Sequence, residues 1–413
     1  MTPAVSPVPM PKPTETAAPA EVRLDGDKRA VVSPAAPAPS FAAWRTGFRS
    51  RAQAAGIAPA TLDRAFAGIS PNPRVLELDR FQPEFTRPIW QYLDSAVSDL
   101  RVKNGQAKGA ALAPVLARIE ADFGVEREVV LAIWGLESAY GANYGDFRVI
   151  RSLATLAWDG RRKAFAEQEL IAALRIIEAG DIAPGRMLGS WAGAMGHTQF
   201  IPSSFLAYAV DFTGDGRRDI WAPGAEDALA STANYLARFG WQTGAPAAVE
   251  VRLPEGFDFR LGDGSTKRSA PAWEAAGIRA MTGAPLPDAG DVAILLPAGA
   301  RGPAFAIYRN FNVIRRYNNA TSYALAISHL ADRIGGAGPF QAAWPRGDRM
   351  LTRAEAQELQ RRLTQQGFDT QGADGIVGPN TRSAVRSWQS ASGRVPDGYV
   401  SSTLLDALRK SDS

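Results

Sequence analysis

One carboxylate in this chain stands on a helical face that should be buried. Within residues 129–137, Val130, Ile133, Trp134 and Glu137 have the i, i+3, i+4, i+7 spacing of a helix face turned toward a core. A carboxyl group among Trp and aliphatic side chains has its pKa raised and can hold a proton near neutral pH. A glycosidase prepares its general acid in this way. The alternative from the helix alone is a partly exposed Glu at a frayed helix end.

The elements around this helix indicate a mainly α (α+β) fold. Apolar periodicity predicts a folded region from Phe41 and helices over residues 111–123, 163–179, 226–239 and 322–334. Short apolar runs between Gly, Pro and Asp predict strands at 247–253, 292–296 and 305–308. We therefore expect an α-rich body with a small β insert at about 246–310.

Composition shifts divide the chain into four parts. Residues 1–39 hold nine of the 29 prolines and are predicted to be a disordered tether. The body spans residues 40–335, a Gly/Pro-containing linker spans 336–350, and a small helical module spans 351–409.

Charge and composition exclude several classes of protein. The chain has 413 residues, of which 46% are hydrophobic and 21% charged, as in soluble globular proteins. A net charge of +4 is too mild to indicate nucleic acid, although it suits an anionic polymer such as a cell wall. The absence of Cys excludes disulfides, and with only two His it argues against catalytic zinc.

Targeting signals are not evident. The sequence has no run of eighteen apolar residues that would span a membrane. Its first residues lack the charged start and apolar core of a secretory signal. Either an export signal has been lost from this sequence, or the protein is not exported by that route.

Two further blocks lie downstream of Glu137. Residues 189–205 read G-S-W-A-G-A-M-G-H-T-Q-F-I-P-S-S-F, and residues 316–323 read R-Y-N-N-A-T-S-Y. Small residues let a backbone approach a ligand closely, and amide and hydroxyl groups supply neutral hydrogen bonds, which suits a sugar groove. Taken alone, such a small-residue run is more often a tight helix contact than a ligand groove.

Together with W-G-L-E-S-A-Y-G at residues 134–141, these blocks resemble the lytic murein transglycosylase B family (glycoside hydrolase family 103), in order and spacing over residues 40–335. The resemblance implies a lysozyme-like catalytic body. It also implies cleavage of the β-1,4 bond between N-acetylmuramic acid and N-acetylglucosamine without water, which leaves 1,6-anhydro ends. Glu137 would be the single acid and base, and no cofactor would be required. The alternatives are a muramidase-type hydrolase and a non-catalytic wall-binding scaffold.

The same resemblance implies the residues that bind substrate. Groove positions that orient acetamido and hydroxyl groups match Ser190, Gln199, Tyr317, Asn318 and Tyr323. A basic pair for the peptide stem or lactyl carboxylate matches Arg161 and Arg162, Tyr92 has the spacing of a groove tyrosine, and His197 stands where an aromatic residue is usual.

A loop at residues 211–219 has the D-x-[ST]-x-D-G spacing of an EF-hand calcium loop. Oxygen ligands would come from Asp211, Thr213, Asp215 and the Arg217 carbonyl, and the family's closing carboxylate would be Asp227, with Glu226 as the alternative. Position twelve is Ala222 instead of the usual Glu. We predict a structural Ca²⁺; a plain Asp/Gly turn is the alternative.

The C-terminal part contains D-G-I-V-G-P-N-T-R-S-A-V-R-S-W-Q at residues 374–389 and resembles the three-helix peptidoglycan-binding module. Leu359, Leu363, Val385, Trp388, Leu404 and Leu408 are its predicted core. The resemblances imply a periplasmic or cell-envelope monomer whose partners are glycan strands and other cell-wall enzymes.

Overall fold

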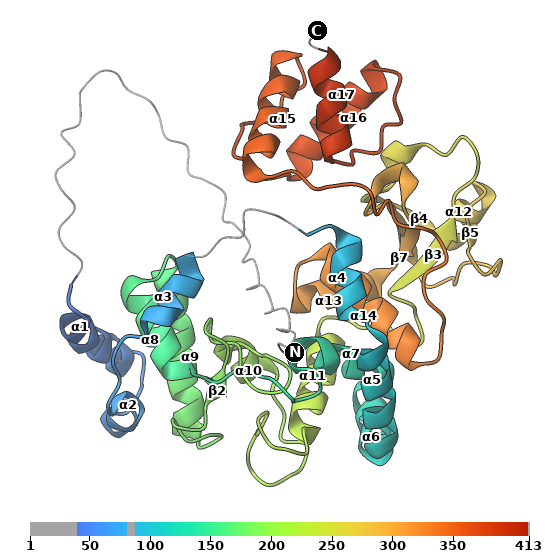
Figure 1. Cartoon of the computed structure of the whole chain (residues 1–413). Helices are drawn as coiled ribbons and strands as arrows, with labels where there is room; N and C mark the ends of the chain where they lie inside the picture. The colour runs from blue at the N-terminus through green and yellow to red at the C-terminus, as the bar shows by residue number, and fades with distance from the viewer. Residues whose placement is uncertain (1–38, 81–86, 412–413) are drawn as a thin grey trace, which may run out of the picture. The chain divides into compact units, whose positions relative to one another are not determined.

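The chain forms two compact units. The computed structural model describes residues 39–80 and 87–411 (Figure 1). Of the described residues, unit 1 comprises 39–80 and 144–228, and unit 2 comprises 87–143 and 229–411. The body predicted over residues 40–335 therefore contributes to both units. The tether predicted for residues 1–39 lies, except for Pro39, outside the described residues.

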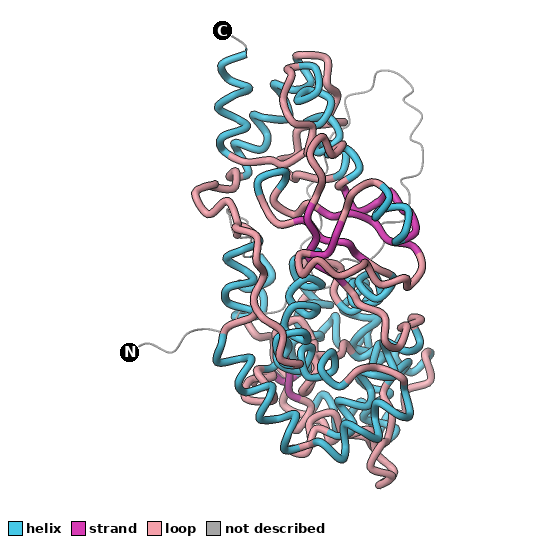
Figure 2. The backbone as a smooth tube through the Cα atoms, turned by 90° about the vertical axis from the view of Figure 1, so that its right-hand side faces the viewer, coloured by secondary structure: helices cyan, strands magenta, loops and turns pink. Residues whose placement is uncertain are grey.

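Helices dominate the structure, which confirms the predicted fold class. They account for 53% of the chain and strands for 8%. Figure 2 shows that almost all the strands gather in one place. Among the described residues, no helix is both long enough and apolar enough to cross a membrane.

Unit 1 is organised around α9 (Lys163–Ala179), which begins and ends at the predicted residues and is stopped by Gly180 with a φ of 87°. Its apolar side packs along α8 (Val149–Asp159), beside it in Figure 1. The other elements of this unit are α1 (Phe41–Ala54), α2 (Pro59–Phe66), α3 (Pro73–Arg80), β1 (Phe147–Arg148), β2 (Leu188–Gly189) and α10 (Pro202–Tyr208), and α11 (Glu226–Arg238) begins here.

The helical part of unit 2 surrounds α7 (Arg127–Ser138), which is buried along most of its length. Its predecessor α6 (Ala113–Phe123) stops, as predicted, at Gly124, whose φ of 65° lets its N–H bond the Glu120 carbonyl at 2.8 Å. The helices that complete this part are α4 (Ile89–Ala96), α5 (Asp99–Ala111), α13 (Arg309–Tyr317) and α14 (Thr321–Ile334). Of these, α14 and α5 pack against α7.

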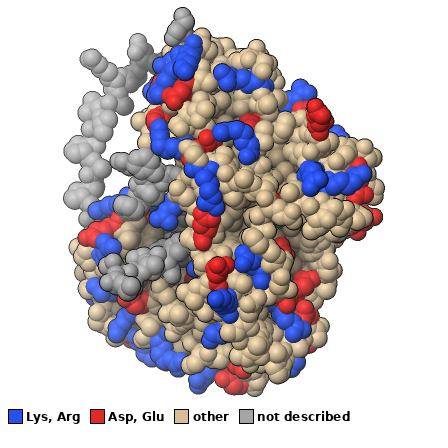
Figure 3. Space-filling view, turned by 45° about the vertical axis from the view of Figure 1, so that its right-hand side comes forward, with Lys and Arg blue, Asp and Glu red and all other residues tan. Residues whose placement is uncertain are grey.

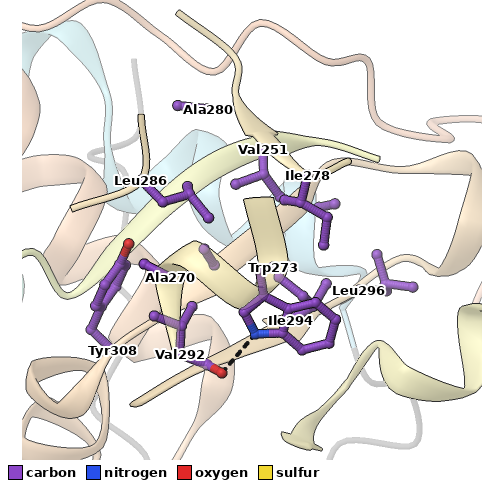
Figure 4. Close-up of a cluster of buried hydrophobic side chains, with 12 residues drawn as sticks. Val251, Ala270, Trp273, Ile278, Ala280, Leu286, Val292, Ile294, Leu296 and Tyr308 are labelled. Atoms are coloured by element: carbon purple, nitrogen blue, oxygen red, sulfur yellow. Dashed lines mark hydrogen bonds between the residues drawn. The ribbon is translucent and has the colours of Figure 1, made fainter. Parts of the chain in front are cut away.

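The β insert of unit 2 is an antiparallel sheet in the order β4-β6-β7-β3-β5. Trp273 fills the core on one face, and its indole Nε1 donates to the Val292 carbonyl at 2.9 Å (Figure 4). The elements are β3 (Ala248–Arg252), η1 (Phe259–Leu261), β4 (Asp263–Ser269), α12 (Ala270–Ala275), β5 (Arg279–Ala280), β6 (Asp291–Leu295), η2 (Gly299–Arg301) and β7 (Ala304–Ile307). Three of the five strands match the prediction.

The C-terminal module has the predicted three helices, α15 (Arg353–Gln365), α16 (Pro379–Ala391) and α17 (Ser402–Ser411). Its core contains all the predicted residues, with Leu404 only partly buried. The preceding segment, predicted to be a linker, makes specific contacts within unit 2: Gln341 N and Ala342 N donate to the Glu250 carboxylate.

Candidate active site

Glu137 lies in the last turn of α7 and is only 7% exposed. The apolar stripe is therefore buried as predicted, and the alternative of an exposed Glu at a frayed end is wrong. The helix stops directly after Ser138, because Ala139 and Tyr140 take left-handed conformations with φ of 51° and 60°. Two consecutive non-glycine residues in this region are strained, as is common at functional sites.

The hydroxyl of Tyr323, on α14, donates a hydrogen bond of 2.6 Å to Glu137 Oε1. Burial raises the pKa of Tyr323 well above its ordinary value, and the nearby Glu137 carboxylate raises it further. The pKa of Tyr92 is raised as well, mainly by burial and to a smaller extent by the Glu137 charge. Both phenols therefore stay protonated and can act as donors. Sequence-predicted residues from α4, α7 and α14 thus meet in unit 2.

Tyr317 and Asn318 lie at the end of α13, where Asn318 is the C-cap residue. Tyr317 is fully buried, and its ring meets that of Tyr235 edge-on at 5.0 Å. Asn318 is 8% exposed. The Tyr317 ring therefore packs α13 against α11, and its contact with sugar stays a prediction.

Sequence reasoning missed the role of Tyr140. Its ring fills a slot between α5 and α7 that only glycines leave open. A Cβ on Gly135 would lie 2.6 Å from the Tyr140 ring, and one on Gly105 would lie 2.5 Å from its hydroxyl oxygen. The hydroxyl donates to the Arg101 carbonyl at 2.8 Å. The turn that follows Glu137 is thereby fixed to α5.

Arg101 was also missed. Its guanidinium donates from Nε to the Gly135 carbonyl at 3.1 Å and from Nη1 to the Ala96 carbonyl at 2.7 Å. Burial lowers the pKa of this Arg. The side chain ties α7, two residues before Glu137, to the end of α4, which carries Tyr92. The signal in the sequence was weak, because an Arg bound to main-chain carbonyls leaves no pattern of paired side chains.

In unit 1, the loop that carries Ser190 is folded tightly on itself. Ser190 Oγ accepts from Ala192 N at 3.3 Å and Ala194 N at 3.0 Å. A Cβ on Gly189 would lie 2.0 Å from the Ala194 carbonyl oxygen. The small residues here therefore allow close approach of the chain to itself.

Gln199 ends this loop with a left-handed φ of 55° and is 5% exposed. Its Nε2 donates to the Tyr144 carbonyl at 3.0 Å and the Gly196 carbonyl at 2.9 Å. With both donors used, the amide orientation is fixed. The Oε1 atom has no hydrogen-bond partner among the described residues, so it is a fixed acceptor.

Both histidines are interior residues. His197 is 4% exposed, and its Nε2 lies 2.9 Å from the Ala222 carbonyl. This placement favours a structural role over the predicted contact with sugar, because the ring atoms are used inside the protein. His329 stacks on Phe340 with ring centroids 3.7 Å apart, and burial lowers its pKa to about 4.

The two arginines predicted to meet an anionic group differ in their surroundings. Arg161 lies near the buried carboxylate of Asp79, which is 3.5 Å from its Nε and accepts from its backbone N–H at 2.9 Å. The Arg162 guanidinium lies 5.3 Å from the Phe165 ring centroid. Arg162 is therefore the more available of the two for an external carboxylate.

The loop predicted to bind calcium is closed by backbone amides. Asp211 accepts from the N–H groups of residues 214, 215 and 216, and Asp227 accepts from those of 212, 213 and 219. These amide bonds lower the pKa of Asp211 despite partial desolvation, whereas burial raises that of Asp227. No group of three or more acidic, His or Cys side chains within residues 39–80 and 87–411 is arranged to hold a metal ion. The residue types fit a cation, but the carboxylate oxygens of Asp211 and Asp227 accept hydrogen bonds from backbone N–H groups of the turn.

Comparison with known proteins decides the family. A profile described as "Transglycosylase SLT domain" matches residues 40–332, more than half of the chain. The chain belongs to this transglycosylase family. A second profile, "Putative peptidoglycan binding domain", matches residues 352–408. The family resemblance and lysozyme-like fold predicted from the sequence are confirmed.

Several characterised members of the transglycosylase family are similar to this chain. Membrane-bound lytic murein transglycosylase B of Escherichia coli K12 is 34% identical over 251 residues, which cover 59% of this chain and 66% of that protein. The chain thus spans slightly less than two thirds of that relative. SltB3 of Pseudomonas aeruginosa, solved in complex with NAG-anhNAM-pentapeptide, is 51% identical with a TM-score of 0.87, covering 90% of this chain and 99% of SltB3.

A third member bears on the cation loop. The lytic transglycosylase Slt35 of Escherichia coli, solved in complex with calcium, is 30% identical with a TM-score of 0.61. The match covers 70% of this chain and 92% of Slt35.

Proposed function

We propose that this transglycosylase cleaves the β-1,4 bond between N-acetylmuramic acid and N-acetylglucosamine in peptidoglycan without water. The observation that carries the proposal is the buried Glu137 carboxyl group, oriented by the Tyr323 hydroxyl at 2.6 Å. A hydroxyl donor fixes the carboxyl geometry without adding a positive charge. The SltB3 complex with NAG-anhNAM-pentapeptide, a ligand with an anhydro sugar, supports the same product.

The proton cycle needs one carboxyl group. Glu137 first donates its proton to the glycosidic oxygen as the bond to C1 breaks. The carboxylate then takes the proton of the C6 hydroxyl of the same muramic acid while that oxygen attacks C1, so the 1,6-anhydro ring closes and Glu137 is protonated again. Ordinary glycosidases use two carboxylates. Here the substrate's acetamido group and C6 hydroxyl replace the second one.

The protein's other residues hold groups in position. Tyr323 orients Glu137 in both steps, because its raised pKa keeps the phenol protonated. Arg101 and Tyr140 fix the end of α7. In unit 1, the fixed Gln199 Oε1 suits a sugar hydroxyl or acetamido N–H, and Arg162 suits a carboxylate. We propose Tyr92, Ser190 and Asn318 as further sugar contacts.

Product analysis tests the reaction. Purified murein digested with the protein should give anhydro-muropeptides, and mass spectrometry should find them 18 Da lighter than the hydrolysed products, the mass of one water. Reducing muramic acid ends would overturn the proposal in favour of a muramidase. If the protein binds murein but yields no fragments, the scaffold alternative is favoured instead.

Calcium at the 211–219 loop is a separate proposal, with oxygens from Asp211, Thr213, Asp215, the Arg217 carbonyl and Asp227. Its support is the loop spacing and the calcium complex of Slt35. Asp215 is the position to change, because its carboxylate accepts only from Arg217 N in the turn, at 2.9 Å. We expect calcium to raise the melting temperature and Asp215→Ala to remove that rise.

A matched control exists outside the loop. Asp369 accepts from Gln371 N, two residues on, at 2.7 Å. Asp369→Ala should keep the calcium response. If calcium leaves the melting temperature of the unchanged protein unaltered, the loop is an ordinary Asp/Gly turn.

We further propose that the C-terminal module binds peptidoglycan and that the protein works in the periplasm or cell envelope as a monomer beside other cell-wall enzymes. The module's family description and the membrane-bound E. coli relative support this. Removal of α15–α17 should weaken sedimentation with murein sacculi.

A further inference from the structure

A hollow of about 400 Å³ lies in unit 2 on the face of the β sheet opposite its Trp273 core. Lys267 of β4 pairs with Ala293 of β6, which pairs with Ile307 of β7, so these three residues form one row across the sheet. All three line the hollow. Their neighbours Val292 and Ile294 belong to the opposite face, where Figure 4 shows them beside Trp273.

The wall of the hollow is basic. Arg309 and Arg316 from α13 join Lys267, against Asp291 as the one acidic lining residue. On the face shown in Figure 3, positive and negative side chains are intermixed. In the hollow, by contrast, none of the three cations forms an ion pair with any described residue. Three unpaired cations around one concave surface attract an anion more strongly than the same charges would on a flat surface.

Two of these cations are held in place by neutral groups. Arg309 Nε donates to the Gly240 carbonyl at 2.8 Å, and the Arg316 guanidinium lies 5.9 Å from the Phe239 ring centroid. Neither contact neutralises the charge. Both guanidinium groups therefore keep N–H donors for a ligand, and part of the entropy cost of ordering them is already met by the fold.

We propose that this hollow binds the carboxylate-bearing stem peptide of peptidoglycan, as a second subsite apart from the Glu137 chemistry. The choice of peptide rests on the proposed function. Guanidinium groups bind carboxylates through paired N–H donors. The floor formed by Ala293 and Ile307 suits small apolar side chains such as that of alanine. A volume of about 400 Å³ is in the usual range for a small-ligand pocket.

The experiment titrates the sugar-free stem pentapeptide, which has no glycosidic bond to cleave, into the full chain by calorimetry. We expect saturable binding that weakens as salt rises. Lys267→Ala and Arg316→Ala should each raise Kd about tenfold, as expected for loss of a hydrogen bond to a charged group. A peptide whose carboxylates are amidated should also bind the unchanged lining at least about tenfold more weakly than the unmodified peptide does, because its carboxylate charge is gone.

Arg252→Ala is the matched control, because Arg252 is exposed on β3 of the same sheet, is not in the lining and has no ion pair among the described residues. It should leave Kd unchanged. Equal displacement of the peptide by inorganic phosphate at matched ionic strength would show a general anion site and overturn the peptide assignment. No binding, or equal weakening by Arg252→Ala, would overturn the subsite. Anhydro product formation is measured without this peptide, so the two proposals can fail separately.

Discussion

Two parts of unit 2 treat a glutamate in opposite ways. At the end of α7, Glu137 is buried and accepts a hydrogen bond from the Tyr323 hydroxyl. At the start of α15, Glu355 is at the surface and receives both Nη atoms of Arg349, at 2.8 and 2.7 Å. Arg349, then the Thr352 N–H, lower the pKa of Glu355 to about 2.

The difference separates a carboxylate that stabilises a fold from one that can exchange a proton. A carboxylate paired with Arg stays ionised throughout the neutral range and cannot act as a general acid there. A tyrosine donor orients a carboxyl group but brings no charge. The partner's chemistry, more than the glutamate itself, therefore decides which of the two can be catalytic.

Replacement of the proposed acid should have the largest effect. Glu137→Gln keeps the size and polarity of the side chain but removes the exchangeable proton. We expect release of anhydro-muropeptides to fall by about 10²–10⁴-fold. Sedimentation with sacculi should be unchanged, because the C-terminal module is intact. Unaltered turnover would refute the assignment of Glu137.

Tyr323→Phe should come next, since it removes the orienting donor and leaves the acid in place. We expect kcat to fall about 10–100-fold, consistent with loss of a hydrogen bond to a charged group. The pH profile of kcat should shift as well, which a purely structural role would not cause.

Tyr235→Phe is the matched control for this variant. Tyr235 is also buried, but its hydroxyl donates to the Arg316 carbonyl at 2.6 Å. It should lower the melting temperature and leave the pH profile of kcat as it was. If both variants gave the same profile, the Tyr323 hydroxyl would have no special link to Glu137.

The sequence predicted best those elements whose own residues carry the signal. The limits of α9 and the stop of α6 at Gly124 were right, because apolar periodicity and a left-handed glycine are local features. The strand β4 was missed, because its sequence D-G-S-T-K-R-S is polar and most of its side chains are exposed. The two-residue β5 offers no pattern to detect.

For the candidate site, the burial of Glu137 followed from its helical stripe, but its partner did not. Tyr323 lies 186 residues away, and only the family resemblance pointed to it. Arg101 contacts main-chain carbonyls of other helices. Every residue type has such a carbonyl, so the sequence does not indicate these contacts. The interior position of His197 depends on a contact with Ala222 O that is equally nonlocal.

In the C-terminal module, the neutral side chain of Gln360 should contribute more to stability than the charge of Glu355. Gln360 is 1% exposed, donates to Asp374 Oδ1, the Ile376 carbonyl and Thr381 Oγ1, and accepts from Gly375 N. Gln360→Ala leaves these groups without their partner and should destabilise the module by about 1–3 kcal/mol. Amide hydrogen exchange across α15 measures this.

Gln365→Ala, at the exposed end of the same helix, is the control for Gln360→Ala and should change exchange little. Cleavage of soluble glycan fragments should be unaffected by either change. Loss of that cleavage in Gln360→Ala would show that the module is needed for the chemistry as well.

Neutralising the surface carboxylate of Glu355 should have the smallest effect, present at neutral pH and lost at low pH. The pKa of Glu355 is lowered in the folded state from its ordinary value of 4.5 to about 2. Its charge therefore stabilises the module at pH values above 4.5, and this stabilisation is lost as pH falls toward about 2. Glu355→Gln keeps a capping side chain and removes the charge. It should cost about 1 kcal/mol or less at pH 7, as for exposed ion pairs, and nothing near pH 2. Amide hydrogen exchange of α15 can be followed between pH 7 and 2 in the unchanged protein and in Glu355→Gln, corrected for intrinsic rates. The two sets of rates should become equal in acid. A constant difference would mean that Glu355 acts through packing and not through its charge.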